Sequence, residues 1–151
     1  MNRGFRPASA DDIAAVAALQ AGYYAADGYA FDAARARRAL AGLIAEPRLG
    51  ALWVAERGGA VVGYLAVTLG YSLEYGGRDA FVDELYVAEG ARGLGLGRDA
   101  LRLAETWCRD AGVRALHLEV EPHRAAALAL YRRGGFEVHG RHLMTKRLDA
   151  E

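Results

Sequence analysis

The stretch Leu85-Tyr-Val-Ala-Glu-Gly-Ala-Arg92-Gly93-Leu-Gly95-Leu-Gly97-Arg98 leads from an apolar strand pattern through a glycine-rich turn into a helical pattern. From Leu96, apolar residues recur at i+4, i+7 and i+8, and Gly112 is well placed to end the helix. Glycines at a helix start let the backbone approach a ligand, and the free N–H groups there favour a phosphate. The stretch therefore predicts an anion-binding loop at the N-terminus of a helix with one buried face.

Two familiar nucleotide loops do not fit this stretch. The dinucleotide fingerprint G-x-G-x-x-G, started at Gly93, places Arg98 where the third glycine belongs, and the Gly-Lys-Ser/Thr of a Walker loop is absent. A purely structural turn is the alternative, but alternating glycines at a helix start cost stability when nothing uses their freedom. A phosphate-bearing ligand other than these nucleotides is favoured.

The flanking sequence predicts an alternation of helices and strands in one domain. Ser9, Asp11 and Asp12 suit the start of a first helix, and Arg57-Gly-Gly is a hairpin signal. The expected strands are 4–6, 51–56, 60–69, 80–88, 114–121 and one that begins at Phe136, and the expected helices follow Asp12, span 32–45, begin at Leu96 and span 123–133. Residues 70–79 are expected to form a polar loop.

Composition sets limits on the partners and the compartment. The chain has 151 residues, 53% of them hydrophobic, which suits a single globular domain over 1–151. Nineteen basic residues balance nineteen acidic ones, so no overall charge attracts nucleic acid or a membrane surface. Cys108 is the only cysteine, and no run of about 18 apolar residues occurs. We expect a cytoplasmic protein without a metal site, nucleic-acid partner or membrane partner.

The loop and its surroundings resemble the GCN5-related N-acetyltransferase (GNAT) family. Arg92 to Gly97 matches that family's pyrophosphate pattern Arg/Gln-x-x-Gly-x-Gly/Ala, and the closing Leu130-Tyr131-x-x-x-Gly135-Phe136 is similar to a second family motif. The similarity extends over nearly the whole chain, although Glu89 stands where many relatives have proline. The resemblance implies an α/β (α+β) fold, with a mixed, mostly antiparallel central sheet of about six to seven strands flanked by about four helices.

The resemblance also implies acetyl-CoA as the acyl-donor cosubstrate and a set of residues that hold it. A β-bulge in the strand before the loop would free backbone groups for the pantetheine arm and the acetyl carbonyl. The implied contacts are Leu85, Tyr86 and Val87 on the strand, Arg92, Gly93, Leu94, Gly95, Leu96, Gly97 and Arg98 in the loop, and Arg124 and Ala127 on the last helix. Relatives often have asparagine where Arg124 stands.

Three side chains are candidates for proton transfer. Tyr131 is protonated near neutral pH and, in its motif, is implied to be the general acid for the departing thiolate. Asp83 and Glu84 resemble the acidic pair of the spermidine/spermine and thialysine N-acetyltransferase branch, in which the first acid is the supposed base. Glu84 would bind substrate or serve as the alternate base, and a solvated pair at a strand end is the structural alternative. In a regular strand the two carboxylates would point to opposite faces.

The sequence thus favours an enzyme that moves acetyl directly to a primary amine. The acids Glu74, Asp79, Asp83 and Glu84, interleaved with tyrosines, favour a small cationic amine. A peptide or protein N-acetyltransferase and a non-catalytic acyl-CoA sensor are the alternatives. His117 and Glu119 are weaker candidates for a proton relay, and Cys108 is expected in the core. The family resemblance admits a homodimer, while the acceptor, the acyl chain and the base stay open.

Overall fold

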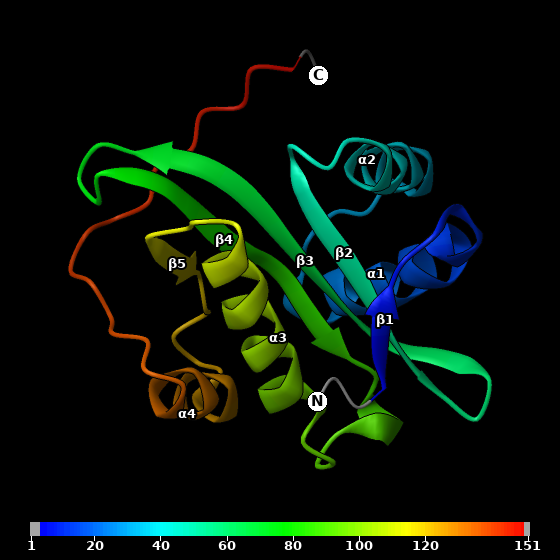
Figure 1. The fold of residues 1–151 in the computed structure, drawn as a ribbon. Coiled ribbons are helices and arrows are strands. Elements are labelled where there is room, and N and C mark those ends of the chain that lie inside the picture. The colour runs from blue at the N-terminus through cyan, green and yellow to red at the C-terminus, as the bar shows by residue number, and fades with distance from the viewer. Residues whose placement is uncertain (1–3, 150–151) are drawn as a thin grey trace.

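The computed structural model describes residues 4–149, which form one mixed sheet with helices on both faces (Figure 1). The strands lie in chain order: β1 (Phe5–Pro7), β2 (Gly50–Arg57), β3 (Ala60–Ser72), β4 (Gly77–Val87) and β5 (Ala115–Leu118). Neighbours up to β4 pair antiparallel, and β5 pairs parallel with β4. The predicted α/β class with a mostly antiparallel sheet is confirmed.

Each face of the sheet has its own apolar core. Helices α1 (Ile13–Asp27) and α2 (Ala33–Ala45) cover one face, where Val16 and Leu40 pack with Val54 and Tyr64. Helices α3 (Leu96–Asp110) and α4 (Ala125–Arg133) cover the other face, where the apolar stripe of α3 packs against β2, β3 and β4. Because strand residues alternate between the faces, helices on both faces bury both sides of the middle of β2 and β3.

The predicted helix start at Ser9 is confirmed in detail. A short 3-10 turn, Ala10–Asp12, precedes α1, and the Ser9 N–H donates to the Asp12 carboxylate at 2.8 Å. Asp12 also accepts two hydrogen bonds from Arg6 of β1, at 2.8 and 2.9 Å. This arrangement fixes the start of α1 relative to the first strand.

No helix of the described residues is long and apolar enough to cross a membrane.

The expected loop over 70–79 is wrong. β3 and β4 continue through it as a long hairpin, with Tyr71 opposite Arg78 and a turn in which the Gly76 N–H donates to the Leu73 carbonyl at 3.2 Å. Polar side chains suggested a loop, but ladder hydrogen bonds do not depend on side-chain polarity where the face is open to solvent. Gly76 adopts a positive φ of 79°, which the turn requires.

The expected count of six to seven strands is also wrong within the described residues, which form five. The predicted strand beginning at Phe136 is absent: Phe136 packs on the core, and residues 137–149 continue as irregular chain outside the sheet. β5 is shorter than the expected 114–121 because its ladder with β4 ends at the pair Val82 and Leu118. Both differences concern tertiary pairing, which local periodicity does not specify.

Candidate active site

The glycine-rich loop forms an uncapped helix N-terminus. Gly93 and Gly95 adopt φ values of 79° and 85°, which favour glycine, and Gly95 is the N-cap of α3. No side chain of the described residues caps this end. The first N–H groups of α3 therefore keep their donor capacity, and the helix dipole adds partial positive charge where they emerge. The predicted anion-binding geometry is present.

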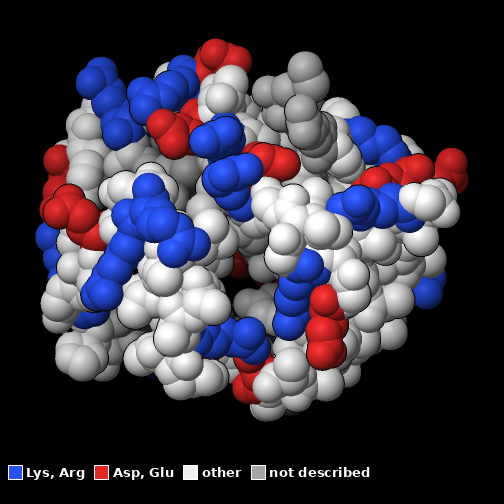
Figure 2. All heavy atoms as spheres, turned by 90° about the horizontal axis from the view of Figure 1, so that it is seen from below, with Lys and Arg blue, Asp and Glu red and all other residues white. Residues whose placement is uncertain are grey.

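A hollow of about 840 Å³ opens between this loop and α4. Its walls carry the side chains of Arg98, Arg102 and Arg133, together with Leu130 and Phe136. The two helices approach closely, because a Cβ added to Gly97 would lie 3.1 Å from Leu130 Cδ2. Figure 2 shows this side of the molecule from below, hollowed near its centre and surrounded by basic side chains. The hollow fits a ligand with phosphate groups and an apolar part.

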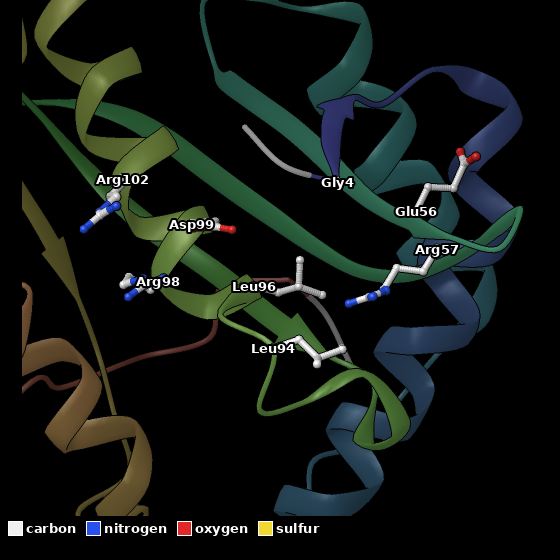
Figure 3. Close-up of a pocket in the computed structure, with 8 residues that line it drawn as sticks. All are labelled: Gly4, Glu56, Arg57, Leu94, Leu96, Arg98, Asp99 and Arg102. Carbon is white, nitrogen blue, oxygen red and sulfur yellow. The ribbon is translucent and has the colours of Figure 1, made fainter. Parts of the chain in front are cut away.

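A second hollow, of about 670 Å³, lies on the other side of the loop (Figure 3). Arg57, at the end of β2, points toward Leu94 and Leu96, whereas Arg98 and Arg102 point away from these leucines. The loop is therefore accessible from two sides.

β4 offers an unpaired edge next to the loop. Its ladder with β5 ends at Val82, so within the described residues the outer edge of β4 from Asp83 to Val87 has no strand partner. The ladder with β3 shifts register where Ala66 faces Glu84 and Val67 faces Val82, so Asp83 is the extra residue of a β-bulge. The bulge that the resemblance implies is thus present. Free backbone groups along this edge are suited to an extended amide-bearing ligand.

The bulge separates the two predicted carboxylates. Glu84 accepts hydrogen bonds from Gln20 Nε2 at 2.9 Å, from Tyr64 Oη at 2.7 Å and from Tyr24 Oη. Asp83 has no side-chain hydrogen-bond partner among the described residues and keeps contact with solvent. The protein around Asp83 still displaces part of its hydration shell and raises its pKa, and the nearby negative charges of Glu84 and Glu119 act in the same direction.

Sequence reasoning did not identify the partners of Glu84. Two of these partners, Gln20 and Tyr24, lie on α1. Together with Asp27, which pairs with Arg124, they stand at i, i+4 and i+7 and so share one face of that helix. This spacing of polar residues is the feature of the sequence that could have predicted a polar face on α1. Burial, followed by the hydrogen bonds to Glu84 and its charge, raises the pKa of Tyr24, and burial and the Glu84 charge raise that of Tyr64. Both phenols therefore remain protonated donors to Glu84 at neutral pH.

Tyr131 lies half-buried on α4, with its ring edge-on to Phe136 at 6.1 Å between centroids. Burial raises its pKa and Arg124 opposes the shift, so the hydroxyl keeps its proton at neutral pH. Tyr23 of α1 stacks on Tyr86 of β4 at 5.4 Å, and burial together with the Glu84 charge raises its pKa to about 12. Neutral phenols thus line the region between α1, β4 and α4.

Arg124 and Arg92 have intramolecular partners. Arg124, just before α4, donates to the carboxylate of Asp27, whose side chain is only 4% exposed. The Nε of Arg124 is buried without a hydrogen-bond partner among the described residues. Arg92 donates through Nε to the Val87 carbonyl at 2.8 Å and lies over the Tyr86 ring. Ala127 lies half-buried on α4, and Leu85 and Val87 pack against the core.

A polar and aromatic cluster continues along β4 and β5. His117 Nε2 lies 3.1 Å from Asp79 Oδ2, and the His117 ring contacts Phe81 and Tyr75 at 5.0 and 5.2 Å between centroids. Of the four acids predicted to attract a cation, Glu74 pairs with Arg141, and Asp79 and Glu84 also have partners. Asp83 is the member of that set without one among the described residues. Those residues contain no metal-binding cluster of three or more His, Cys, Asp or Glu side chains.

The mixed sheet places a bulged and partly unpaired strand edge beside an uncapped helix N-terminus, which suits an extended amide-bearing ligand that ends in phosphate groups. Residues 15–136 match the acetyltransferase (GNAT) family, and the chain belongs to it. Enzymes of this family use acetyl-CoA as the acyl donor.

Two solved structures have a similar fold. The integron cassette protein HFX_CASS3 from the mobile metagenome of Cole Harbour Salt Marsh is 38% identical, with a TM-score of 0.86 over 98% of this chain and 92% of that chain. A predicted acetyltransferase from Clostridium acetobutylicum, solved with acetyl-CoA, has a TM-score of 0.80 over 94% of both chains and, at 16% identity, shares the fold alone.

One curated relative matches part of the chain. An IAA acetyltransferase from Azospirillum brasilense is 39% identical over 87 residues, which are 58% of this chain and 54% of that protein. The chain thus matches about half the length of this relative.

Proposed function

We propose that this protein is an N-acetyltransferase that moves acetyl from acetyl-CoA directly to a primary amine. The observation that carries the proposal is the unpaired edge of β4 at 83–87, which leads to the uncapped N-terminus of α3. Acetyl-CoA has an extended arm with amide groups, which can pair with a strand edge, and a pyrophosphate, which can bind at a helix N-terminus. When bound, acetyl-CoA supplies a thioester carbonyl that is open to attack by an amine.

Two residues of the chain, Asp83 and Tyr131, then carry out the proton transfers. Asp83 is without a side-chain partner among the described residues and has a raised pKa, which suits a base that removes a proton from the acceptor ammonium so that the neutral amine can attack. Tyr131 keeps its proton and can deliver it to the sulfur as the carbon–sulfur bond breaks. The amine nitrogen forms the new bond to the acetyl carbon in the same ternary complex, and its second proton passes to solvent as the amide forms. Burial raises the pKa of Cys108 to about 11, which does not suit a nucleophile.

Glu84 serves this site as a positioning residue in our proposal. Its three donors hold the carboxylate on the α1 side of β4. They also attach α1 to the bulge. Glu84 thereby fixes the backbone on which Asp83 lies, so the two acids divide the roles of base and support.

The acceptor that these residues favour is a small primary amine. Asp83 and the nearby exposed Glu119 offer negative charge to an ammonium, and Phe81, which is 40% exposed, offers an apolar surface near His117. A polyamine carries a second ammonium group, which would need a further carboxylate. Glu74 and Asp79 already pair with Arg141 and His117. This weakens the case for a spermidine/spermine-like polyamine and favours an amine with a single charge and an apolar body.

Thermal unfolding with and without acetyl-CoA tests the donor without knowledge of the acceptor. Ligand at about 100 times its Kd adds about 2.7 kcal/mol, which is roughly 5 to 10 °C for a domain of this size. We expect this shift with acetyl-CoA but not with ATP or NAD at equal concentration. An unchanged Tm at millimolar acetyl-CoA would remove the main support for the proposal.

Thiol release measured over a panel of amines tests the acceptor. Monoamines with aromatic or alkyl bodies should give a higher kcat/KM than spermidine. A clear preference for peptides would instead place the chain among the peptide N-acetyltransferases. Acetyl-CoA binding without release in the presence of any amine would favour the acyl-CoA sensor.

A further inference from the structure

His117 of β5 is held between two aromatic rings and a carboxylate. Its ring lies 5.0 Å from that of Phe81 and 5.2 Å from that of Tyr75, measured between centroids. Its Nε2 lies 3.1 Å from Asp79 Oδ2, and the side chains of His117 and Asp79 are only 20% and 14% exposed. Contacts with three neighbours fix the orientation of the imidazole, so the direction of each ring nitrogen is fixed as well.

The Asp79 carboxylate also decides which ring nitrogen of His117 carries the proton. An ionised carboxylate accepts hydrogen bonds and does not donate them, so in the neutral imidazole the proton is on Nε2 and Nδ1 keeps its lone pair. Nδ1 has no hydrogen-bond partner among the described residues and is not buried. His117 therefore offers a hydrogen-bond acceptor of fixed direction to a ligand that carries an O–H or N–H group.

Phe81 and His117 form an aromatic surface on the open part of one sheet face. The strand residues that alternate with them pack into the core under α3: Ala80, Val82, Leu116 and Leu118. Phe81 and His117 therefore lie on the opposite face, the one that α1 and α2 cover farther along the sheet. Figure 1 shows the hairpin end of β3 and β4 extending past these two helices. Phe81 is 40% exposed, so a flat ring can stack on it with its edge toward His117.

Two carboxylates lie one strand repeat from this aromatic surface. Asp83 follows Phe81 by two residues, and Glu119 follows His117 by two residues. Residues two apart in a strand are separated by about 7 Å. Burial, followed by the negative charges of Glu84 and Glu119, raises the pKa of Asp83, so Glu119 lies near that carboxylate. An ammonium bound there is one such step from the rings, a separation that an ethylene chain between nitrogen and ring covers.

We propose that His117 is a specificity-determining residue that selects acceptor amines with a hydrogen-bond donor on an aromatic ring. This inference rests on the proposed function and narrows its acceptor class to arylethylamines whose ring bears an O–H or N–H group. The ammonium group binds at Asp83 and Glu119. The ring stacks on Phe81, and its donor bonds to Nδ1 of His117. Asp79 is a positioning residue, because it acts through His117 by holding the tautomer that accepts.

Thiol release with matched amines tests the selection. The panel is phenethylamine, its meta- and para-hydroxy derivatives and hexylamine, each measured as kcat/KM at saturating acetyl-CoA. A hydrogen bond to a half-exposed acceptor contributes up to about tenfold, so the better of the two hydroxylated amines should exceed phenethylamine by about that factor. Hexylamine, which has no ring, should be the poorest of the four. Equal values for phenethylamine and both derivatives, or a higher value for hexylamine, would overturn the inference.

Two substitutions separate the hydrogen bond of His117 from its packing. In His117→Gln the side-chain amide keeps a donor for Asp79 but Nδ1 is lost, and in His117→Phe a ring remains between Phe81 and Tyr75. Both variants should bring the ratio of kcat/KM for the hydroxylated amine to that for phenethylamine close to one. The control His142→Gln changes an exposed histidine outside the site and should keep the wild-type ratio. A wild-type ratio in both His117 variants would contradict the proposal.

Nitrogen NMR of isotope-labelled protein tests the same contact without turnover. The His117 ring should be in the Nε2–H tautomer, and the preferred hydroxylated amine should move its Nδ1 resonance more than phenethylamine does. Asp79→Asn, whose amide can itself donate to Nε2, should weaken both the tautomer preference and the kinetic ratio. An Nδ1–H tautomer in the wild type would overturn the inference. If no amine releases thiol, the proposed function fails, while the Nδ1 response still decides whether His117 binds the ring.

Discussion

Asp83 and Glu84 are adjacent in the chain but differ in their environment, because the bulge at Asp83 interrupts the alternation of β4. Glu84 accepts from Gln20, Tyr24 and Tyr64, whereas no side chain of the described residues donates to Asp83. The pair therefore divides into a supporting carboxylate and a carboxylate available for chemistry. This division leads to opposite predictions for the two substitutions.

Asp83→Asn should reduce kcat/KM by about 100-fold at neutral pH, the usual contribution of acid–base catalysis, with little change in Tm. Because the pKa of Asp83 is raised, the acid limb of the wild-type pH–rate profile should lie above the 3.8 of an ordinary aspartate. Activity is lost as the pH falls through that raised value, since only the ionised form accepts a proton. An activity within threefold of wild type would show that the base is another group.

Glu84→Ala should instead lower the free energy of unfolding by about 2 to 4 kcal/mol, because it leaves three buried or half-buried donors without their acceptor. Urea denaturation measures the loss, and Glu84→Gln, which retains one acceptor oxygen, should recover part of it. If Glu84→Ala unfolds like wild type yet loses turnover as Asp83→Asn does, Glu84 acts in the chemistry rather than as a support.

Tyr131→Phe should lower turnover at pH 7 by about 100-fold while acetyl-CoA binding stays within about twofold. Phenylalanine retains the ring and its contact with Phe136, so we expect the variant to fold as the wild type does. Thiol release measures the rate and the acetyl-CoA thermal shift measures binding. A fall in turnover of less than about threefold would exclude Tyr131 as the general acid.

Gly95→Ala and Gly112→Ala form a matched pair at the two ends of α3. Both glycines have positive φ, 85° and 75°, so each alanine should cost about 1 to 2 kcal/mol of stability. Only Gly95 lies in the candidate phosphate loop, so only Gly95→Ala should weaken acetyl-CoA binding, by tenfold or more. Equal affinities for the two variants, measured by titration calorimetry, would indicate that the loop is structural.

Arg124→Ala should destabilise the fold by about 2 kcal/mol, because it leaves the buried Asp27 carboxylate unpaired. The double variant Asp27→Asn/Arg124→Ala removes that charge and should regain part of the loss. Chemical denaturation of the two variants measures the difference. If the single variant is as stable as wild type but binds acetyl-CoA weakly, the role of Arg124 is to bind the ligand rather than to stabilise the fold through Asp27 of α1.

Asp12 should give the protein an acid-sensitive stability. Hydrogen bonds from Arg6, followed by the Ser9 N–H, lower the pKa of Asp12 from 3.8 to about 2. Its contribution is therefore complete above about pH 4 and is lost as the pH falls through about 2. Asp12→Asn should be less stable than wild type at pH 6, and the difference should shrink toward pH 2. A constant difference in Tm across this range would contradict the linkage.

Local sequence determined most of the elements and the loop. The helical repeat of α3, the hairpin at Arg57-Gly-Gly and the capping residues around Ser9 each act within one turn or one ladder, so their signals are contained in short stretches. The glycines at 93 and 95 are equally local, because a positive φ is a property of one residue. The anion-binding loop and the helices that precede it could therefore be predicted without knowledge of the tertiary structure.

Tertiary structure alone decided the rest. Whether Asp83 or Glu84 is free depends on a bulge and on donors from α1, sixty or more residues away in the chain. Arg124 meets Asp27 because α1 and the start of α4 approach one another, and residues 137–149 lie outside the sheet, where Arg141 pairs with Glu74. Contacts between distant segments depend on how whole elements pack, and the side-chain pattern of one segment does not by itself specify which partner it will meet.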